Sequence, residues 1–376
     1  MRFIADVGSY LPIVLVAFLV AGAVALVLTP AIRGRAIRHG LLDRPNQRRV
    51  NTRPVPRAGG LAVVAGFVTI GAGLAILDPD GAVVPRPLFL ELNELVALLV
   101  GGLLAGLIGG LDDWFDLRAR WQLAGQLVLA AFAVALGIGV GAINNPFGPG
   151  TIAFEGAFAA GFTVVWIVGM INSINFIDGL DGLSSGIALI AAVTLGVISL
   201  TTQIAQPFIA VLCFALAGSL LGFLRWNFHP AAIFAGTSGV MFVGYTLAVL
   251  SILGSAKVAV ALLVLAVPII DTFWIIVRRL GSGRSPFTPD RKHIHHRLLD
   301  LGLSHRQTVV LIYGICTALG VLSLVLSGAN QVYAFLGVLV GFGLVLLLLT
   351  RGEAEDALEA ESYAESYDEE GTSLRS

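Results

Sequence analysis

The chain has 376 residues, of which 57% are apolar and only 12% charged, and its mean hydropathy is +0.89. A soluble domain carries about 25% charged residues, so this composition excludes an ordinary soluble protein and favours one that crosses a membrane repeatedly. The net charge of −1 gives no basic excess for a nucleic-acid partner, and the two cysteines lie in apolar runs, which argues against a disulfide framework.

Eleven apolar runs follow one another along the chain. Each is long enough to cross about 30 Å of hydrocarbon as a helix. Their approximate ranges are 10–32, 59–78, 93–111, 121–141, 156–173, 183–202, 206–224, 236–254, 257–279, 308–327 and 331–350. Because a helix satisfies its own backbone hydrogen bonds in lipid, we predict an all-α polytopic membrane protein with about eleven transmembrane helices.

The distribution of arginine predicts how these helices are oriented. Residues 33–58 contain eight arginines, and residues 278–307 contain six more together with Lys292. The positive-inside rule places both loops in the cytoplasm, so the N-terminus is predicted outside and the C-terminus inside. Residues 351–376 are rich in Asp and Glu and poor in apolar residues, and we predict a disordered acidic tail.

The first polar cluster is GGLDDWFDL, which places Asp112, Asp113 and Asp116 at the predicted cytoplasmic end of span 93–111. Three acids would be costly at the bilayer centre but cost little at the interface. A solvated loop would explain them. Adjacent carboxylates also repel one another, so holding Asp112 and Asp113 together favours a bound cation.

The second cluster is NSINFIDGLDGL, at the end of span 156–173. Asn172, Asn175 and Asp178 recur every three residues, so they share one face if the helix continues that far, and Asp181 follows. Amide and carboxylate oxygens are the hard ligands that Mg²⁺ prefers. A helix end with capping residues is the alternative interpretation.

The third cluster, SPFTPDRKHIHHRLL, contains His293, His295, His296 and Arg297, and the segment after Pro289 is predicted to form a short amphipathic helix. Its cationic, donor-rich character suits phosphate groups. A zinc site is the alternative, but no cysteine or fourth ligand is evident.

Two further elements carry single polar groups. Arg57 precedes two glycines in RPVPRAGG, and Asn227 and His229 lie in RWNFHPAAIFAGTSG. Asp271 lies inside span 257–279, where an acid is either functional or paired with a group such as Arg278.

All these elements share one predicted face, which favours a metal-bound, phosphate-rich substrate at the cytoplasmic interface. ATP hydrolysis is not expected, because the chain has no phosphate-binding Gly-x-x-x-x-Gly-Lys loop.

Together these motifs resemble those of the polyprenyl-phosphate N-acetylhexosamine-1-phosphate transferases, membrane enzymes that start bacterial surface-glycan synthesis. The resemblance rests on PRAGGL, GGLDDWFDL, NSINFIDGLDGL, SPFTPDRKHIHHRLL and the span pattern, and it covers residues 33–349. The His-Ile-His-His run resembles the branch that uses UDP-N-acetylglucosamine or a related sugar.

The resemblance implies that residues 1–350 form one transferase domain in the cell membrane, with its active site on the cytoplasmic face. Undecaprenyl phosphate would attack the β-phosphorus of a UDP-N-acetylhexosamine, UMP would leave, and the sugar 1-phosphate would stay on the lipid. The implied cofactor is Mg²⁺, with Mn²⁺ as the alternative ion. The sequence leaves the choice of sugar and a homodimeric assembly open.

From the residues and the resemblance together, we assign three groups of site residues. The catalytic group is Asp112, Asp113 and Asp116. The metal ligands are Asn175 and Asp178. The substrate-binding group is Arg57, Asn172, Asp181, Asn227, His293, His295, His296 and Arg297.

Three positions depart from the family's pattern. Thr237 stands where the family has an aspartate that binds magnesium, Gln122 where a Lys or Arg is usual, and Asn51 where a His is usual. Asp116, Asp178 or Asp271 could replace the missing carboxylate. A catalytically impaired relative that binds lipid phosphate or a partner is therefore the alternative function. A transporter is the third interpretation, although its charged groups should lie nearer the midplane.

Overall fold

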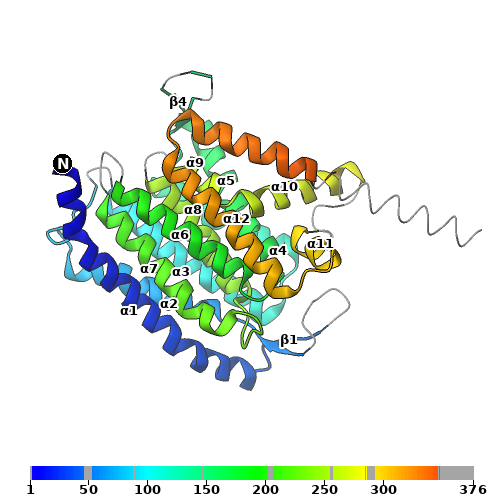
Figure 1. Cartoon of the computed structure of the whole chain (residues 1–376). Coiled ribbons are helices and arrows are strands. Elements are labelled where there is room, and N and C mark those ends of the chain that lie inside the picture. Colours follow the sequence, from blue (N-terminus) through cyan, green and yellow to red (C-terminus); the bar gives the residue numbers. More distant parts are fainter. Residues whose placement is uncertain are drawn as a thin grey trace, which may run out of the picture.

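The computed structural model describes residues 2–45, 53–87, 90–145, 147–148, 150–201, 206–254, 257–283, 285, 293–345 and 347. The predicted acidic tail, 351–376, and the variant position Asn51 lie outside these residues, so they remain predictions. The described chain is dominated by helices that pack side by side into one body (Figure 1).

The helices and strands follow the chain in this order. The helices are α1 (Arg2–Arg38), α2 (Gly60–Leu77), α3 (Leu92–Phe115), α4 (Ala119–Ala135), α5 (Gly156–Ile177), α6 (Leu183–Thr201), α7 (Pro207–Asn227), α8 (Gly236–Leu253), α9 (Lys257–Val264), α10 (Ala266–Gly281), α11 (Ile294–Asp300) and α12 (His305–Val325). Two short antiparallel hairpins pair β1 (Leu42–Asp43) with β2 (Val55–Pro56) and β3 (Ala142–Asn144) with β4 (Thr151–Ala153).

Eight of the described helices are long and apolar enough to cross a membrane, and nine if α9 and α10 form one broken span. The predicted all-α polytopic membrane protein is thereby confirmed. The predicted spans 121–141 and 331–350 correspond to shorter apolar helices, α4 and Ala329–Val345. The count of eleven and the orientation of the termini stay predictions.

The predicted span 257–279 is not one straight helix. Its two halves, Val258–Val264 and Ala266–Gly281, are bent by 78°. Pro268 lies in the first turn of α10, where a proline is tolerated because its missing N–H has no partner within the helix. The same proline would remove a hydrogen bond from a continuous helix, so the sequence favours a break just before it.

Helices α6, α7 and α8 form the buried centre, and α1 and α12 lie toward the outside (Figure 1). Glycine residues allow the closest contacts between the helices. A Cβ atom added at Gly218 of α7 would lie 2.0 Å from the carbonyl oxygen of Phe18, and one at Gly60 of α2 would lie 2.0 Å from Cα of Gly239. These helices therefore pack backbone against backbone, as is common in membrane proteins.

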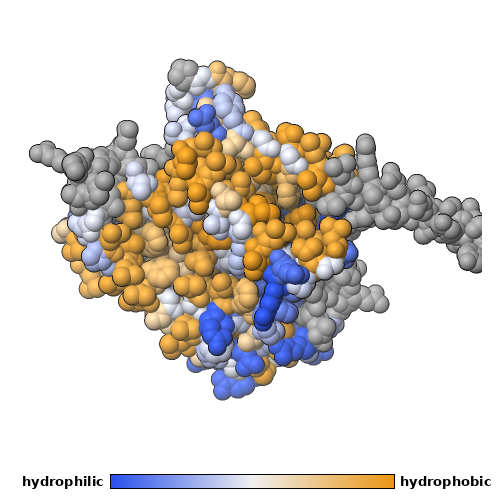
Figure 2. All heavy atoms as spheres, in the orientation of Figure 1, coloured by the Kyte–Doolittle hydropathy of each residue, from blue (hydrophilic) through white to orange (hydrophobic). Residues whose placement is uncertain are grey.

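The surface is apolar around the body of the molecule. Figure 2 shows hydrophobic side chains over most of the visible face, with hydrophilic groups gathered at the lower end and a smaller set near the β3–β4 hairpin. In Figure 1 the lower end carries the β1–β2 hairpin, α11 and the start of α12. An apolar body between two polar ends is the arrangement expected for a protein embedded in a bilayer.

Candidate active site at the polar end of the bundle

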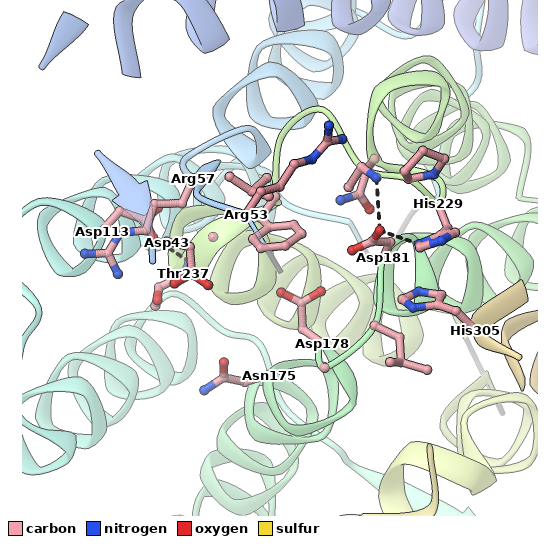
Figure 3. A pocket seen from close by; sticks show the side chains of 18 of the residues that line it. Asp43, Arg53, Arg57, Asp113, Asn175, Asp178, Asp181, His229, Thr237 and His305 are labelled. Carbon is pink, nitrogen blue, oxygen red and sulfur yellow. Dashed lines mark hydrogen bonds and ion pairs between the residues drawn. The ribbon is translucent and has the colours of Figure 1, made fainter. Parts of the chain in front are cut away.

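A cavity of about 430 Å³ lies at this polar end. It is lined by Asp43, Arg53, Val55, Arg57, Asp113, Asn175, Asp178, Gly179, Leu180, Asp181, Asn227, His229, Pro230, Ala231, Phe234, Gly236, Thr237, His296 and His305. The lining residues come from segments far apart in sequence, and most of them are polar or charged. In Figure 3, Asp178 lies between a side formed by Asp113, Arg57 and Thr237 and a side formed by Asp181, His229 and His305.

The first of these sides is built where α3 meets the N-terminus of α8. Asp113 Oδ1 accepts a hydrogen bond from the backbone N–H of Thr237 (2.8 Å), and Oδ2 accepts one from that of Ser238 (3.1 Å). Asp113 thus satisfies N–H groups that the first turn of a helix leaves without partners. Gly236 adopts φ +72°, and a Cβ there would lie 2.6 Å from both carboxylate oxygens.

The centre of the cavity carries Asn175 and Asp178, at the end of α5. Ser184 donates a short hydrogen bond to Asp178 Oδ1. The pKa of Asp178 is raised to about 7, chiefly because the carboxyl group is withdrawn from water, and the charges of Asp113 and Asp181 act in the same direction. A cation placed among these groups would offset that cost.

The opposite side is a cluster of one carboxylate and two imidazoles. His229 Nδ1–H donates to Asp181 Oδ2 (2.7 Å), and the backbone N–H of Ala231 donates to the same oxygen (3.0 Å). The ring centroids of His229 and His305 lie 4.0 Å apart, with 23° between the ring planes. The side chain of Asn227 donates to the carbonyl of Ile233 (3.0 Å).

This cluster is close enough to hold a metal ion, since the ligand atoms of Asp181, His229 and His305 all lie within 4.8 Å of one another. The stacking argues against it. A metal lies near the plane of each imidazole that binds it, and two nearly parallel rings in a stack share no such position. We therefore interpret the cluster as a polar, flat surface for hydrogen bonding and stacking.

The β1–β2 hairpin adds the basic groups of the cavity. Arg57 follows β2, and Arg53 and Asp43 lie on the same hairpin. Arg57 Nη1 is 3.7 Å from Asp116 Oδ1, and Asp116 is itself 88% exposed. Two arginines beside the Asp113 side give this end of the cavity donors that suit phosphate oxygens.

Several predicted site residues do line the cavity, namely Asp113, Asn175, Asp178, Arg57, Asp181, Asn227, His296 and the variant position Thr237. Six others do not, of which three lie outside the histidine segment. Asp112 is buried and its Oδ1 accepts hydrogen bonds from Gln122 Nε2 (2.9 Å) and the backbone N–H of Leu117 (3.0 Å). Asp116 caps α3 in a left-handed conformation, and Asn172 donates to Gln126 Oε1 (2.6 Å), one turn deeper in the bundle.

The predicted residues of the histidine segment also differ in whether they line the cavity. Only His296 of its four predicted residues lines the cavity. His293 is bonded to Asp271 by its Nδ1 (2.7 Å), and Arg297 is buried. His295 is also buried and lies against Gly179, where a Cβ would be 2.1 Å from its Nε2. Burial lowers the pKa of His295 well below its usual range, and the neighbouring histidines lower it further.

The cavity also contains residues that were not predicted, including Asp43, Arg53, Phe234 and His305. His305 begins α12 after a capping box formed by Ser304 and Gln307, and that signal marks a helix start without showing that its first side chain faces a site. The sequence around His229 identifies it only as a polar group.

Comparison with known proteins settles the family. Residues 95–255 match the model of glycosyl transferase family 4. The chain is 36% identical over 324 residues to a probable undecaprenyl-phosphate N-acetylglucosaminyl 1-phosphate transferase of Bacillus subtilis, with 84% of this chain and 86% of that protein covered. The chain belongs to this family.

Two further relatives have names of the same kind. A decaprenyl-phosphate N-acetylglucosaminephosphotransferase of Mycolicibacterium smegmatis is 34% identical over 377 residues, covering 92% of this chain and 91% of that protein. An undecaprenyl-phosphate alpha-N-acetylglucosaminyl 1-phosphate transferase of Yersinia pestis is 30% identical over 288 residues, or 74% of each chain. The resemblance of the motifs to the polyprenyl-phosphate N-acetylhexosamine-1-phosphate transferases is confirmed.

Proposed function

We propose that this member of the family transfers N-acetylhexosamine 1-phosphate, most simply N-acetylglucosamine 1-phosphate, from a UDP-sugar to undecaprenyl phosphate and releases UMP. The observation that carries the proposal is one cavity that unites carboxylate and amide oxygens, two arginines and three histidines at the polar end of an apolar bundle. Such a cavity suits a diphosphate substrate that meets a lipid phosphate at the membrane surface. The names of the relatives support the same reaction.

The donor set of the cavity fits a divalent cation. Asp113, Asn175 and Asp178 offer hard oxygen ligands, and withdrawal from water raises the pKa of Asp178, so a bound cation would stabilise its charged form. We infer that these residues would hold Mg²⁺, or Mn²⁺, which would neutralise phosphate charge when bound. Thr237 offers only a neutral hydroxyl beside them.

We assign the remaining work to the chain's own side chains. Arg53 and Arg57 bind phosphate oxygens near Asp113, and the Asp181–His229–His305 cluster, with Asn227 and His296, holds the nucleotide side. Asp113 also fixes α3 against the N-terminus of α8, so the wall that carries Thr237 keeps its place. A cavity with fixed donors lowers the barrier by orienting the two substrates for in-line attack.

We further propose that the cavity faces the cytoplasm of a cell membrane, with the N-terminus outside and the C-terminus inside. The arginine-rich segments 33–58 and 278–307 support this orientation. The predicted odd number of spans, about eleven, would place the two termini on opposite sides, as this orientation requires. A homodimer remains compatible with the proposal and is not required by it.

The test is transfer of labelled sugar phosphate to undecaprenyl phosphate by the full chain in detergent, with a panel of UDP-sugars and with or without Mg²⁺. Labelled lipid and free UMP in equal amounts are expected, with no product after the divalent ions are chelated. No product from any UDP-N-acetylhexosamine, while the Bacillus subtilis relative is active in parallel, would refute transfer. That outcome would favour the non-catalytic relative which Thr237 suggests.

Replacing Thr237 with aspartate tests the metal assignment. The new carboxylate would lie at the N-terminus of α8, where a negative charge is favoured, and would add to the charge that Asp113 and Asp178 present. We expect the Mg²⁺ concentration for half-maximal activity to fall about tenfold, which corresponds to about 1.4 kcal/mol. Thr237→Asn is the control of the same shape, and identical Mg²⁺ curves for the two variants would contradict the assignment.

A further inference from the structure

Helix α11 is a short helix that lies beside the cavity. It has seven residues, Ile294–Asp300, and the connection before it from residue 286 lies outside the described chain. Two of its side chains meet the site. His296 lines the cavity, and His295 packs against Gly179, the residue after Asp178. A helix this short has little intrinsic stability, so tertiary contacts must fix its position.

The contact at its N-terminus comes from Asp271, which is only 1% exposed on α10. The backbone N–H of Ile294 donates to Asp271 Oδ1 (2.9 Å), and Nδ1–H of His293 donates to Oδ2 (2.7 Å). Since an ionised carboxylate can only accept, this pairing also fixes which ring nitrogen of His293 carries the proton. Both oxygens of one buried carboxylate are therefore used on the first two residues of the α11 segment.

Aromatic and cationic groups of the described residues lie around this contact. His293 packs edge-on against the ring of Phe176 (5.8 Å between centroids) and stacks on His295 (5.5 Å), while the guanidinium of Arg279 lies 5.9 Å from the centre of the Phe176 ring. Asp271 does not line the cavity. Asp271 is therefore not placed to replace the missing metal ligand, and its observed hydrogen bonds do not involve Arg278. They go to His293 and to Ile294 of α11 instead.

We propose that Asp271 is a positioning residue of the transfer reaction, which acts by holding α11 so that His296 enters the cavity and His295 seats on Gly179. This inference rests on the proposed function for its kinetic consequences. The geometry itself does not depend on that function. Asp271 lies on α10, after the 78° bend that separates this helix from α9.

Replacement of Asp271 by alanine tests the proposal through a double-mutant cycle with His296→Ala. In the wild-type background we expect kcat/KM for the UDP-sugar to fall about tenfold to a hundredfold, because a small displacement of a binding group is enough for such a loss. In the His296→Ala background, replacing Asp271 with alanine should lower kcat/KM less than about threefold, since the group that Asp271 positions is already absent. Equal losses in the two backgrounds would overturn the proposal.

Hydrogen exchange gives a readout that needs no catalysis. The amides of Ile294 and the first turn of α11 should exchange faster in Asp271→Ala than in the wild type, whereas Asp300→Ala, at the exposed end of the same helix, should leave that turn protected. Unchanged exchange in Asp271→Ala would overturn the proposal even if activity falls. If the wild type transfers no sugar phosphate, the proposed function fails while this exchange result still decides the role of Asp271.

Asp271→Asn serves if the alanine variant does not fold. Its Oδ1 can still accept from Ile294, but its amide nitrogen cannot accept the proton of His293 Nδ1. We expect protection of the Ile294 amide to be retained and the loss of kcat/KM to be smaller than in Asp271→Ala, again disappearing in the His296→Ala background. A loss that persists in that background would count against positioning.

Discussion

Asp178→Asn is expected to lower the transfer rate about 10²–10³-fold. The asparagine keeps the size of the side chain and removes the charge that would hold the divalent cation, and a cation that stabilises developing phosphate charge contributes several kcal/mol to such a reaction. The measurement is the initial rate at saturating UDP-sugar and lipid phosphate over a series of Mg²⁺ concentrations. Asp300→Asn, an exposed change on α11, is the matched control and should retain the wild-type rate.

The pKa of Asp178 gives this prediction a pH signature. Because that pKa is raised to about 7, a cation must displace a proton from the carboxyl group below pH 7. The Mg²⁺ concentration for half-maximal activity should therefore rise as the pH falls below about 7, by at most about tenfold per pH unit. Without metal, the raised pKa means that the fold loses stability as pH rises from about 4 to about 7. A pH-independent Mg²⁺ requirement would show that Asp178 is not a ligand.

Gly236→Ala is expected to remove nearly all activity and to lower the thermal stability of the protein. Its Cβ would lie 2.6 Å from both Asp113 oxygens and 2.7 Å from the backbone nitrogen of Ala58, so α8 or Asp113 must shift. The positive φ of +72° adds about 1 kcal/mol of backbone strain. Activity and the unfolding midpoint in detergent check the two effects separately.

Gly40→Ala separates strain from displacement. Gly40 has almost the same dihedral, φ +70°, but no atom lies within 4 Å of the Cβ that alanine would add. It should therefore show the modest loss of stability that backbone strain causes and keep its activity. Equal loss of activity in the two variants would mean that the contact of Gly236 with Asp113 is not what matters.

The sequence predicted the apolar helices and much of the cavity because hydrophobicity and local spacing carry that information. Asn175 and Asp178, three residues apart at a helix end, do share a face. Asp112 and Asp113 could not both face the cavity, because successive residues point about 100° apart around a helix. Only Asp113 faces it, and Asp112 turns to Gln122, the position where the family usually has a cation.

Other features depend on contacts between distant segments. His305 stacks on His229, which lies 76 positions earlier in the chain, and no local pattern predicts that pairing. Four neighbouring residues of the histidine segment looked equivalent in sequence, but helical geometry sends His296 to the cavity and His293 to Asp271. The break before α10 was likewise visible only as a proline in an apolar run.

The glycine contact of α2 with α8 has a dynamic consequence. Gly60 and Gly239 meet at their Cα atoms, and Gly109 of α3 meets the backbone of Thr237 and Ser238, so neither neighbour leaves α8 room to slide or rotate. That wall is therefore stationary while substrates come and go. Displacement during a turnover is then expected in α11, a seven-residue helix whose start is held by the side chain of Asp271.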